Sequence, residues 1–375
     1  MKPETIAVHA GAAIDRETGA VSPPIHLSTT FVHGPASEPT FGRLYIREGN
    51  PTEARLETTL AALEAGERAL AFASGMAAAA TLLAALEPGA HVLFHRDLYQ
   101  GVRQVAQEQL PRWGLAASFA DLADPVAARA ALRPETRAIW LETPTNPRLE
   151  VIDLAGAAAL ARAAGALLVV DGTFATPALQ RPLAWGADVV LHSTTKYLGG
   201  HSDVQGGALV FARAAGLAER VAQLRHDLGA VASPFNSWLV LRGIKSLACR
   251  MERHSANALA LARSLAGHPA LAALLYPGLA DHPGHAVAAR QMTGGFGGML
   301  SIRVAGGRAA AVAAAGRLRL FTNATSLGGV ESLVEHRASS EGPATTAPED
   351  LLRLSVGLEH PDDLVEDLRR ALDAA

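Results

Sequence analysis

Polar residues follow two short apolar runs of the sequence, and their types could support covalent chemistry on an amine. LLVV (167–170) ends at Asp171, and DVVL (188–191) is followed by HSTTK (192–196), which ends at Lys196. Ligands of open parallel sheets bind at the carboxyl ends of the strands, so we expect this acid and this lysine to lie at one edge. Taken singly, each residue also has a simpler interpretation, a loop cap for the acid and a solvated side chain for the lysine.

The segment SGM (74–76) adds a third feature, because small residues that open a helix leave free backbone amides that favour an anion. Together the three features describe a phosphate pocket beside an amine and an acid. A pyridoxal phosphate enzyme needs this set: a lysine that forms a Schiff base, a carboxylate that keeps the ring nitrogen protonated, and phosphate donors. The chain has neither the Gly-Lys-Ser/Thr loop of a Walker site nor a three-glycine fingerprint after a first strand, which excludes both nucleotide sites.

Eight segments, in order along nearly the whole chain, resemble the Cys/Met-metabolism family of fold-type I pyridoxal phosphate enzymes. That family includes cystathionine γ-synthase, cystathionine γ- and β-lyases, methionine γ-lyase and the homoserine-ester sulfhydrylases. HSTTKYLGGHSD is the most specific of the matching segments. The segments are YIREGNPT (45–52), ASGMAAA (73–79), DLYQG (97–101), ETPTNP (142–147), VVDGTFATP (169–177), HSTTKYLGGHSD (192–203), TSLGGVESL (325–333) and LRLSVGLE (352–359).

The resemblance implies a role for each motif residue around pyridoxal 5'-phosphate. Lys196 matches the Schiff-base lysine, which also shuttles protons, and Asp171 matches the partner of the pyridine nitrogen. Tyr99 matches the tyrosine that stacks on the cofactor ring, and Asn146 matches the asparagine near the phenolic oxygen. Without the resemblance, the tyrosine would indicate core packing and the asparagine a turn.

The resemblance also implies the phosphate donors, which are the backbone amides of Gly75 and Met76 and the hydroxyls of Ser193 and Thr195. Two further residues that bind this phosphate would come from another subunit.

Tyr45 and Arg47 match a pair that reaches the phosphate of a neighbouring subunit. The expected assembly is therefore an obligate dimer within a homotetramer, a dimer of dimers. A solvated arginine is the alternative for Arg47.

The expected substrate-binding residues lie near the C-terminal end of the chain. Arg353 stands among apolar residues in LLRLSVGLE, where an unpaired guanidinium would be costly, so it requires an anion. The family assigns this position to the substrate's α-carboxylate, and Ser326 lies in a loop that frames the same site. A structural salt bridge is the alternative for the arginine. Glu331 resembles an acidic position that could meet the amino group of cysteine or of the distal half of cystathionine.

Synthases and lyases share the early reaction steps, in which the amino acid displaces Lys196 from the cofactor and loses its α-proton. The motifs for these steps therefore do not distinguish the two activities. We predict small amino-acid substrates and place cystathionine γ-synthase first, with cystathionine γ-lyase as the alternative and a catalytically silent regulatory protein as a remote one. DLYQG lacks the cysteine that methionine γ-lyases carry after Tyr-Gly, which argues against that activity. Gly172, Gln100 and EHRASSEGP (335–343) depart from the common family pattern and bear on the substrate, not on the cofactor.

The elements that must position these residues indicate an α/β fold. Short apolar strands alternate with helices over residues 51–234, which predicts a large domain with a mainly parallel sheet between helices. Helices are expected to begin at Asn50-Pro51 and to span DLAGAAALARAAG (153–165), and strands are expected at HVLF (91–94), RAIWLE (137–142), LLVV and DVVL. The resemblance implies that the sheet is of the seven-stranded type. Residues 1–50 read as an extended arm that lies over another surface, of its own subunit or of a neighbour, and the resemblance implies the neighbour. Residues 235–375 predict a smaller α+β domain with strands at GGMLSIRV (297–304) and LLRLSVGLE (351–359). Its long first helical segment should break near Gly243, and its last helix should begin at residues 361–363.

Composition excludes several classes of protein. The 375 residues are 49% hydrophobic and 18% charged, with 36 acidic and 33 basic side chains, so no charge excess favours nucleic acid. The longest apolar runs, such as AGALLVV (164–170), are strand-length, and no membrane partner is expected.

The single cysteine, Cys249, forms no internal disulfide and is expected to be a buried small hydrophobe. The start of the chain lacks a secretory pattern, so a cytoplasmic enzyme is expected, with no metal at DHPGH (281–285).

Overall fold

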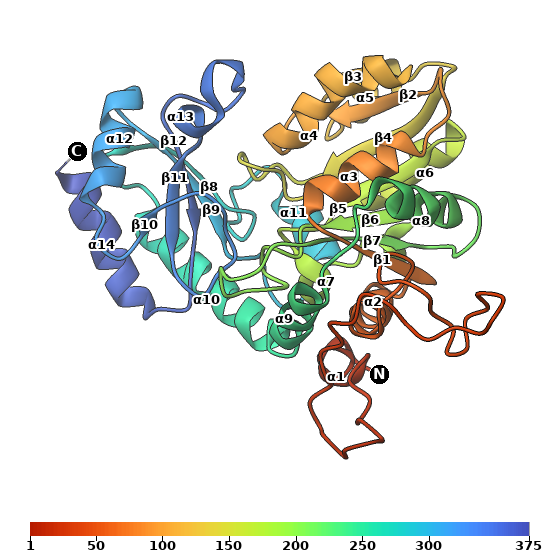
Figure 1. The fold of residues 1–375 in the computed structure, drawn as a ribbon. Helices are drawn as coiled ribbons and strands as arrows, with labels where there is room; N and C mark the ends of the chain where they lie inside the picture. Colours follow the sequence, from red (N-terminus) through yellow and green to blue (C-terminus); the bar gives the residue numbers. More distant parts are fainter. Residues whose placement is uncertain (375) are drawn as a thin grey trace.

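The computed structural model describes residues 1–374, which form two sheets that are each covered by helices (Figure 1). The large sheet has the strand order β1-β7-β6-β5-β4-β2-β3, in which β7 is antiparallel to both neighbours and every other pair is parallel. This arrangement confirms the α/β class and the mainly parallel sheet. The strands are β1 (Arg68–Phe72), β2 (His91–His95), β3 (Ala116–Ala120), β4 (Thr136–Glu142), β5 (Leu167–Asp171), β6 (Val189–His192) and β7 (Gly207–Phe211).

Both faces of the large sheet are buried, which explains why its strands are continuous apolar runs. In β4, Trp140 packs with α3 and α8 on one face, whereas Ile139 and Leu141 pack with α5 and α6 on the other. The helices of this part of the chain are α2 (Pro51–Glu64), α3 (Gly75–Ala84), α4 (Gln100–Gln104), α5 (Pro125–Ala130), α6 (Leu154–Ala163), α7 (Thr176–Leu179) and α8 (Leu217–Leu228).

Local sequence signals set where these helices begin. Asn50 precedes α2, and its side-chain oxygen accepts a hydrogen bond from the backbone N–H of Thr52 at 2.8 Å, with Pro51 at the first helical position. Asp153 caps α6 in the same way, by accepting from the N–H of Ala155 at 3.1 Å. The sequence predicted both helices.

The smaller sheet has the order β10-β11-β12-β9-β8, and only its β10–β11 pair is parallel. The predicted strands at 297–304 and 351–359 and the last helix are confirmed. The strands are β8 (Leu271–Leu275), β9 (Met299–Val304), β10 (Thr322–Asn323), β11 (Leu333–His336) and β12 (Leu351–Ser355). The helices are α9 (Pro234–Ile244), α10 (Leu247–Leu265), α11 (His285–Gln291), α12 (Gly307–Arg317), α13 (Arg337–Glu341) and α14 (Pro361–Asp373).

The long helical segment breaks where the sequence predicted, because α9 ends at Ile244 and α10 begins at Leu247. The first half of α10 packs in a core shared with the large domain, through Met251, while Leu261 packs against the smaller sheet. The helix thus belongs to both cores, and the domain boundary at residue 234 stays a prediction. The prediction for Cys249 was wrong: its side chain is exposed, because it lies on the outer face of α10.

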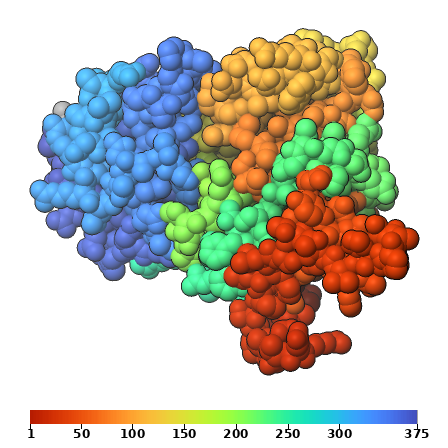
Figure 2. Space-filling view, viewed as in Figure 1, coloured from red at the N-terminus to blue at the C-terminus, as the bar shows by residue number. Residues whose placement is uncertain are grey.

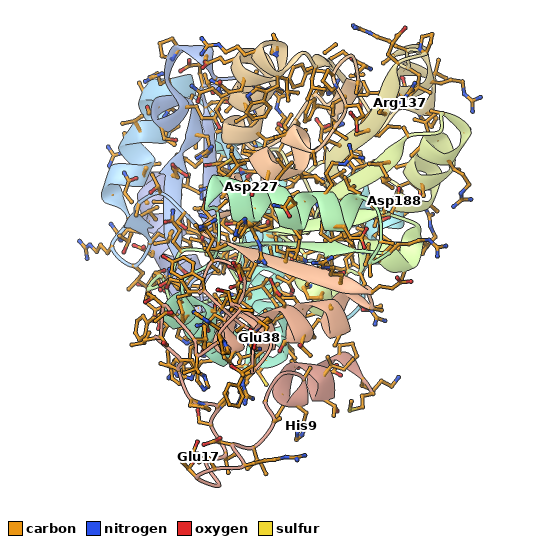
Figure 3. The ribbon with its side chains drawn as sticks, turned by 45° about the vertical axis from the view of Figure 1, so that its right-hand side comes forward. His9, Glu17, Glu38, Arg137, Asp188 and Asp227 are labelled. Atoms are coloured by element: carbon orange, nitrogen blue, oxygen red, sulfur yellow. The ribbon has the colours of Figure 1, made fainter. Side chains whose placement is uncertain are left out.

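The N-terminal arm contains one short helix, α1 (Pro3–His9), and is otherwise irregular as far as Asn50. Figure 2 shows the arm projecting from the body beside the large domain, and in Figure 3 Glu17 lies at its outer end. Besides Met1, four large apolar side chains of the arm are at least 66% exposed, which suits an arm that another surface covers. They are Val21, Leu27, Val32 and Phe41.

Within residues 1–374, no helix is both long and apolar enough to cross a bilayer.

Candidate active site

A cavity of about 580 Å³ lies at the carboxyl ends of the large-sheet strands and takes one wall from the smaller domain. The structure brings most of the predicted site residues to its lining, although their roles stay predictions. These residues are Gly75, Met76, Tyr99, Asn146, Asp171, Ser193, Thr195, Lys196, Ser326 and Arg353.

The acid and the lysine are positioned by neighbouring parallel strands. Asp171 is the last residue of β5, and its carboxylate accepts a hydrogen bond from the N–H of Thr173 at 2.9 Å. Lys196 follows β6 in a turn, where its N–H donates to the carbonyl of Ser193 at 3.1 Å. Its Nζ donates to the hydroxyl of Ser326 at 2.6 Å, so the amine is held across the cavity from the smaller domain.

Burial perturbs both groups in the direction that favours the uncharged form. Burial raises the pKa of Asp171 above its ordinary value. Burial, together with the nearby charge of Arg353, lowers the pKa of Lys196 to about 8. A lysine with such a pKa offers a neutral, nucleophilic amine near physiological pH, which an ordinary lysine does not.

This pKa predicts the pH dependence of cofactor uptake by the apoprotein. As the pH falls below about 8, a growing share of Lys196 is protonated and cannot attack an aldehyde, so the rate of reaction with pyridoxal phosphate should rise with pH and level off above about 8. The absorbance change on mixing, followed between pH 6 and 10.5, measures the rate. A rise that continues to the range of an ordinary lysine, about 10.4, would contradict the assignment.

The amino-terminal end of α3 forms a cradle for an anion. The hydroxyl of Ser74 caps the helix by accepting from the N–H of Ala77 at 3.0 Å, while the first amides, those of Gly75 and Met76, have no acceptor within the helix. A Cβ atom on Gly75 would lie 3.0 Å from the Cβ of Ser193, so glycine lets the serine approach the helix end. Thr195 is fixed beside them, since its hydroxyl accepts from the N–H of Gly206 at 3.0 Å.

The predicted stacking residue, Tyr99, directly precedes α4 and lines the cavity. A Cβ atom on Gly101 would lie 2.6 Å from Cε1 of this tyrosine, so only glycine leaves room for the ring. The cavity therefore presents an aromatic ring, an amine, a carboxylate and an anion cradle. The residues present fit pyridoxal phosphate, with the cradle for its phosphate and Asp171 for its ring nitrogen.

Arg353 lies in β12 and is 3% exposed, and it forms the salt bridge that was the alternative prediction from the sequence, while its binding of substrate stays a prediction. Glu335 lies opposite it in register on β11 and forms an ion pair with Nη2. The arginine also donates to Oδ1 of Asn146 at 3.1 Å and to the carbonyl of Ser326 at 2.9 Å. Burial lowers its pKa to about 10, so it stays charged.

Ser326 connects the arginine and the lysine. Its backbone has φ +82°, a left-handed conformation that is rare for a residue with a side chain. In this conformation its carbonyl accepts from Arg353 and its hydroxyl from Lys196. A strained backbone that is held by two functional side chains is typical of active sites.

Sequence reasoning missed several residues of the cavity wall. Arg337 lines the cavity and bonds both Glu335, at 2.9 Å, and Glu341, at 2.5 Å. These residues lie in the stretch 335–343, whose departure from the family pattern was visible, although no local signal pointed to the cavity. Glu142 was also missed, and its place at the end of a predicted strand was a signal that could have found it.

Three predicted site residues do not line this cavity. Tyr45 is 44% exposed, and Nη1 of Arg47 lies 3.0 Å from Nε2 of His226, so neither reaches the phosphate cradle of its own chain. Glu331 accepts a hydrogen bond from Ser202 and lies outside the lining. Their roles remain predictions.

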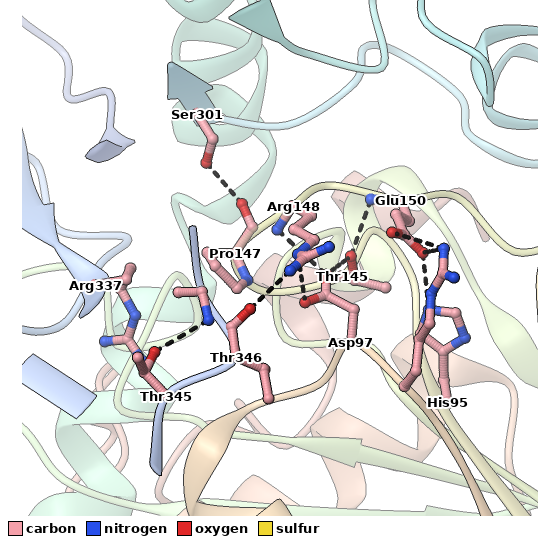
Figure 4. A network of polar contacts seen from close by, with 12 residues as sticks. His95, Asp97, Thr145, Pro147, Arg148, Glu150, Ser301, Arg337, Thr345 and Thr346 are labelled. Carbon is pink, nitrogen blue, oxygen red and sulfur yellow. Dashed lines mark hydrogen bonds and ion pairs between the residues drawn. The ribbon is translucent and has the colours of Figure 1, made fainter. Parts of the chain in front are cut away.

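The loop that carries Asn146 is tied to both domains (Figure 4). On the large-domain side, the carboxylate of Asp97 accepts from the hydroxyl of Thr145 at 2.5 Å and from the N–H of Arg148 at 3.2 Å. On the other side, the hydroxyl of Ser301 donates to the carbonyl of Pro147 at 2.7 Å, and Arg148 donates to the carbonyl of Thr346 at 2.7 Å. The loop is therefore held in place by both domains.

His95, Asp121 and Glu150 come close together near this loop, but their atoms are already used. Nδ1 of His95 accepts from the N–H of Leu122 at 3.0 Å, so its Nε2 carries the proton that it donates to Glu150 at 3.1 Å. Arg96 pairs with both carboxylates. The cluster is an ion-pair network and supports no metal site.

Comparisons with known proteins agree with this geometry. The family model described as "Cys/Met metabolism PLP-dependent enzyme" matches residues 4–373. A cystathionine gamma-synthase of Mycobacterium tuberculosis is 50% identical over 99% of this chain and 96% of its own length. A cystathionine gamma-lyase of Bacillus subtilis is 43% identical over the whole of both chains.

A solved structure gives the same result. The cystathionine gamma synthase of Xanthomonas oryzae pv. oryzae, in complex with aminoacrylate and cysteine, superposes with a TM-score of 0.95 at 43% identity and covers 100% of this chain and 98% of its own. The match extends over nearly the whole chain. It therefore includes the sequence motifs, both sheets and the cavity that contains Lys196. The chain belongs to the Cys/Met metabolism family of PLP-dependent enzymes.

Proposed function

We propose that the enzyme joins an O-activated homoserine to cysteine and so makes cystathionine. In this reaction the bond between Cγ and the ester oxygen breaks, a bond between Cγ and the cysteine sulfur forms, and the thiol proton is released. The observation that carries the proposal is the cavity that places Lys196, Asp171 and Arg353 together, in a chain whose 50%-identical relatives are named cystathionine gamma-synthases.

The chain's own residues have separable tasks in this proposal. Pyridoxal phosphate, when bound, supplies an electron sink for the carbanion that forms at the α-carbon. Arg353 binds the substrate's α-carboxylate and so orients its α-carbon toward Lys196. Nζ of Lys196 then takes the α-proton, which its lowered pKa permits at neutral pH.

Cystathionine γ-lyase is the second candidate, since a lyase relative matches the whole chain at 43% identity. An assay of the purified enzyme distinguishes the two. Incubation with O-acetyl- or O-succinylhomoserine plus cysteine should give cystathionine, measured by chromatography, faster than cystathionine alone gives 2-oxobutanoate and ammonia. The reverse order would replace the synthase by the lyase. No product in either assay from protein that binds the cofactor would favour the silent regulatory protein.

We also propose that the enzyme is a homotetramer built from two dimers and that it works in the cytoplasm. The assembly is supported by the exposed arm, because Tyr45 and Arg47 lie outside the cavity of their own chain, as residues that serve a neighbour would. The cytoplasmic location is supported by the single cysteine. A chain with one cysteine cannot form the internal disulfides that are common in secreted proteins.

Subunit mixing tests the role of the arm. Lys196→Ala and Arg47→Ala subunits should each be nearly inactive, but a mixture should recover activity, because a hybrid dimer contains one intact site. Steady-state activity after subunit exchange, demonstrated by mass tagging, measures the recovery. Exchange without recovery would mean that the arm serves its own chain, and a monomer by light scattering would exclude the assembly.

A further inference from the structure

A second carboxyl group lies beside Asp171 at the floor of the cavity. Glu142 is the last residue of β4 and pairs in register with Asp171, the last residue of β5. The two strands are parallel, so both carboxyl groups reach the same edge of the sheet. Glu142 is only 4% exposed and lines the cavity.

The contact that Glu142 makes is with the main chain of Tyr99. Its Oε2 accepts a hydrogen bond from the N–H of Tyr99 at 3.0 Å. Tyr99 stands just before the first turn of α4, with φ −52° and ψ 127°, and its own side chain makes no capping bond. The bond to Glu142 therefore fixes the peptide from which the ring projects, while Gly101 leaves the space for the ring.

The groups that face Glu142 decide its charge. They are Asp171 on β5, Asp97 after β2 and Arg353 on β12. Burial, reinforced by the two aspartates, raises the pKa of Glu142 well above its ordinary value, and the Tyr99 N–H and Arg353 act in the opposite direction. The arginine is already paired with Glu335, and two adjacent buried carboxylates do not both ionise at low cost.

We propose that Glu142 is a positioning residue that works as a neutral acid: it holds the main chain of Tyr99 and so sets where the ring lies over the cofactor. Asp171, in register beside it, works in its charged form, because the protonated ring nitrogen of the bound cofactor would offset the burial that otherwise favours its neutral form. The inference rests on the proposed role of Tyr99 and does not depend on whether the enzyme is a synthase or a lyase.

The two carboxyl groups can be tested by the same chemical change. Glu142→Gln keeps an oxygen that accepts from the Tyr99 N–H, whereas Glu142→Leu removes it at similar volume. The dissociation constant of pyridoxal phosphate should stay within about threefold for Glu142→Gln and rise about tenfold for Glu142→Leu, which is the size of one buried hydrogen bond. Asp171→Asn should also weaken binding by at least about tenfold, because it removes a charge.

Titration of the apoproteins measures these constants, and circular dichroism in the cofactor's absorption band reports how the ring is held. Glu135→Gln, an exposed change just before the other end of β4, is the matched control and should behave as the unmodified protein. Far-UV circular dichroism establishes that each variant folds. If Glu142→Leu fails to fold, the contrast between Glu142→Gln and Asp171→Asn still decides the charge states.

A double-mutant cycle tests whether Glu142 acts through the tyrosine. In a Tyr99→Ala background, Glu142→Leu should cost less than about twofold, because the ring that it positions is gone. Full additivity of the two changes would overturn the positioning role. Loss of affinity in Glu142→Gln as large as in Asp171→Asn would overturn the neutral state. Either result leaves the assay for cystathionine synthesis unaffected, so the two proposals fail separately.

Discussion

Replacement of Lys196 by alanine should abolish turnover while the protein remains folded. The residue is proposed both to attach the cofactor and to move the α-proton, and the loss of proton transfer alone lowers rates by about 10²–10⁴-fold. Its one side-chain hydrogen bond, to Ser326, contributes little to folding by comparison with the buried core. The rate of cystathionine formation and the thermal unfolding of the variant measure the two effects.

The composition of the chain makes the control for this experiment simple. The chain has three lysines, Lys2, Lys196 and Lys245. Borohydride reduction in the presence of pyridoxal phosphate should fix the cofactor on Lys196, identified by peptide mass. Lys245→Ala, at the end of α9 and away from the cavity lining, should keep both colour and activity. Label on Lys2 or Lys245 in the unmodified protein would overturn the assignment.

Replacement of Arg353 by lysine should leave the cofactor in place and slow every amino-acid substrate. Lysine cannot copy the two-pronged geometry with which a guanidinium binds a carboxylate. The expected loss of transition-state stabilisation is about 1.5–3 kcal/mol, or one to two decades in kcat/KM. Values of kcat/KM for substrates that differ only beyond the γ-carbon measure it, because all of them share the α-carboxylate.

The neighbouring strand provides a control for the arginine. Arg303 lies on β9 in an exposed ion pair with Asp350, so Arg303→Lys should change neither spectrum nor kinetics. Bleaching of the cofactor in Arg353→Lys, or a loss that varies with the substrate's side chain, would show that Arg353 does not bind the α-carboxylate.

Much of the fold was readable from the sequence because its signals are local. The apolar runs of β2, β4, β5 and β6, and the capped start of α2, all predicted elements that the structure contains. Strands such as β3 and β8 were missed, since they are short and only partly buried, and their pattern does not differ from that of a helix. Cys249 was placed wrongly because alternation within a helix does not say which face meets solvent.

The site was predictable where motifs end strands and not where distant segments meet. Lys196 and Ser326 are 130 residues apart, and Arg353 and Asn146 are 207 apart. Only the folded chain shows that these pairs are in contact. Arg353 was predicted to bind the substrate's α-carboxylate, with a structural salt bridge as the alternative, and the register between β11 and β12 supplies Glu335 as its partner within the chain.

The loop at residues 143–150 bears on how this enzyme could be recombined with its relatives. A chimaera cut at residue 234 would take Ser301 and Thr346 from one parent and Pro147 and Arg148 from the other. The acceptors of these two hydrogen bonds are the main-chain carbonyls of Pro147 and Thr346. The bonds therefore tolerate a change of side chain at either residue but not a shift of the backbone. Exchange of the C-terminal part should therefore succeed best when residues 143–150 come from the same parent as that part. The exchanged unit then consists of two segments that are separate in the sequence.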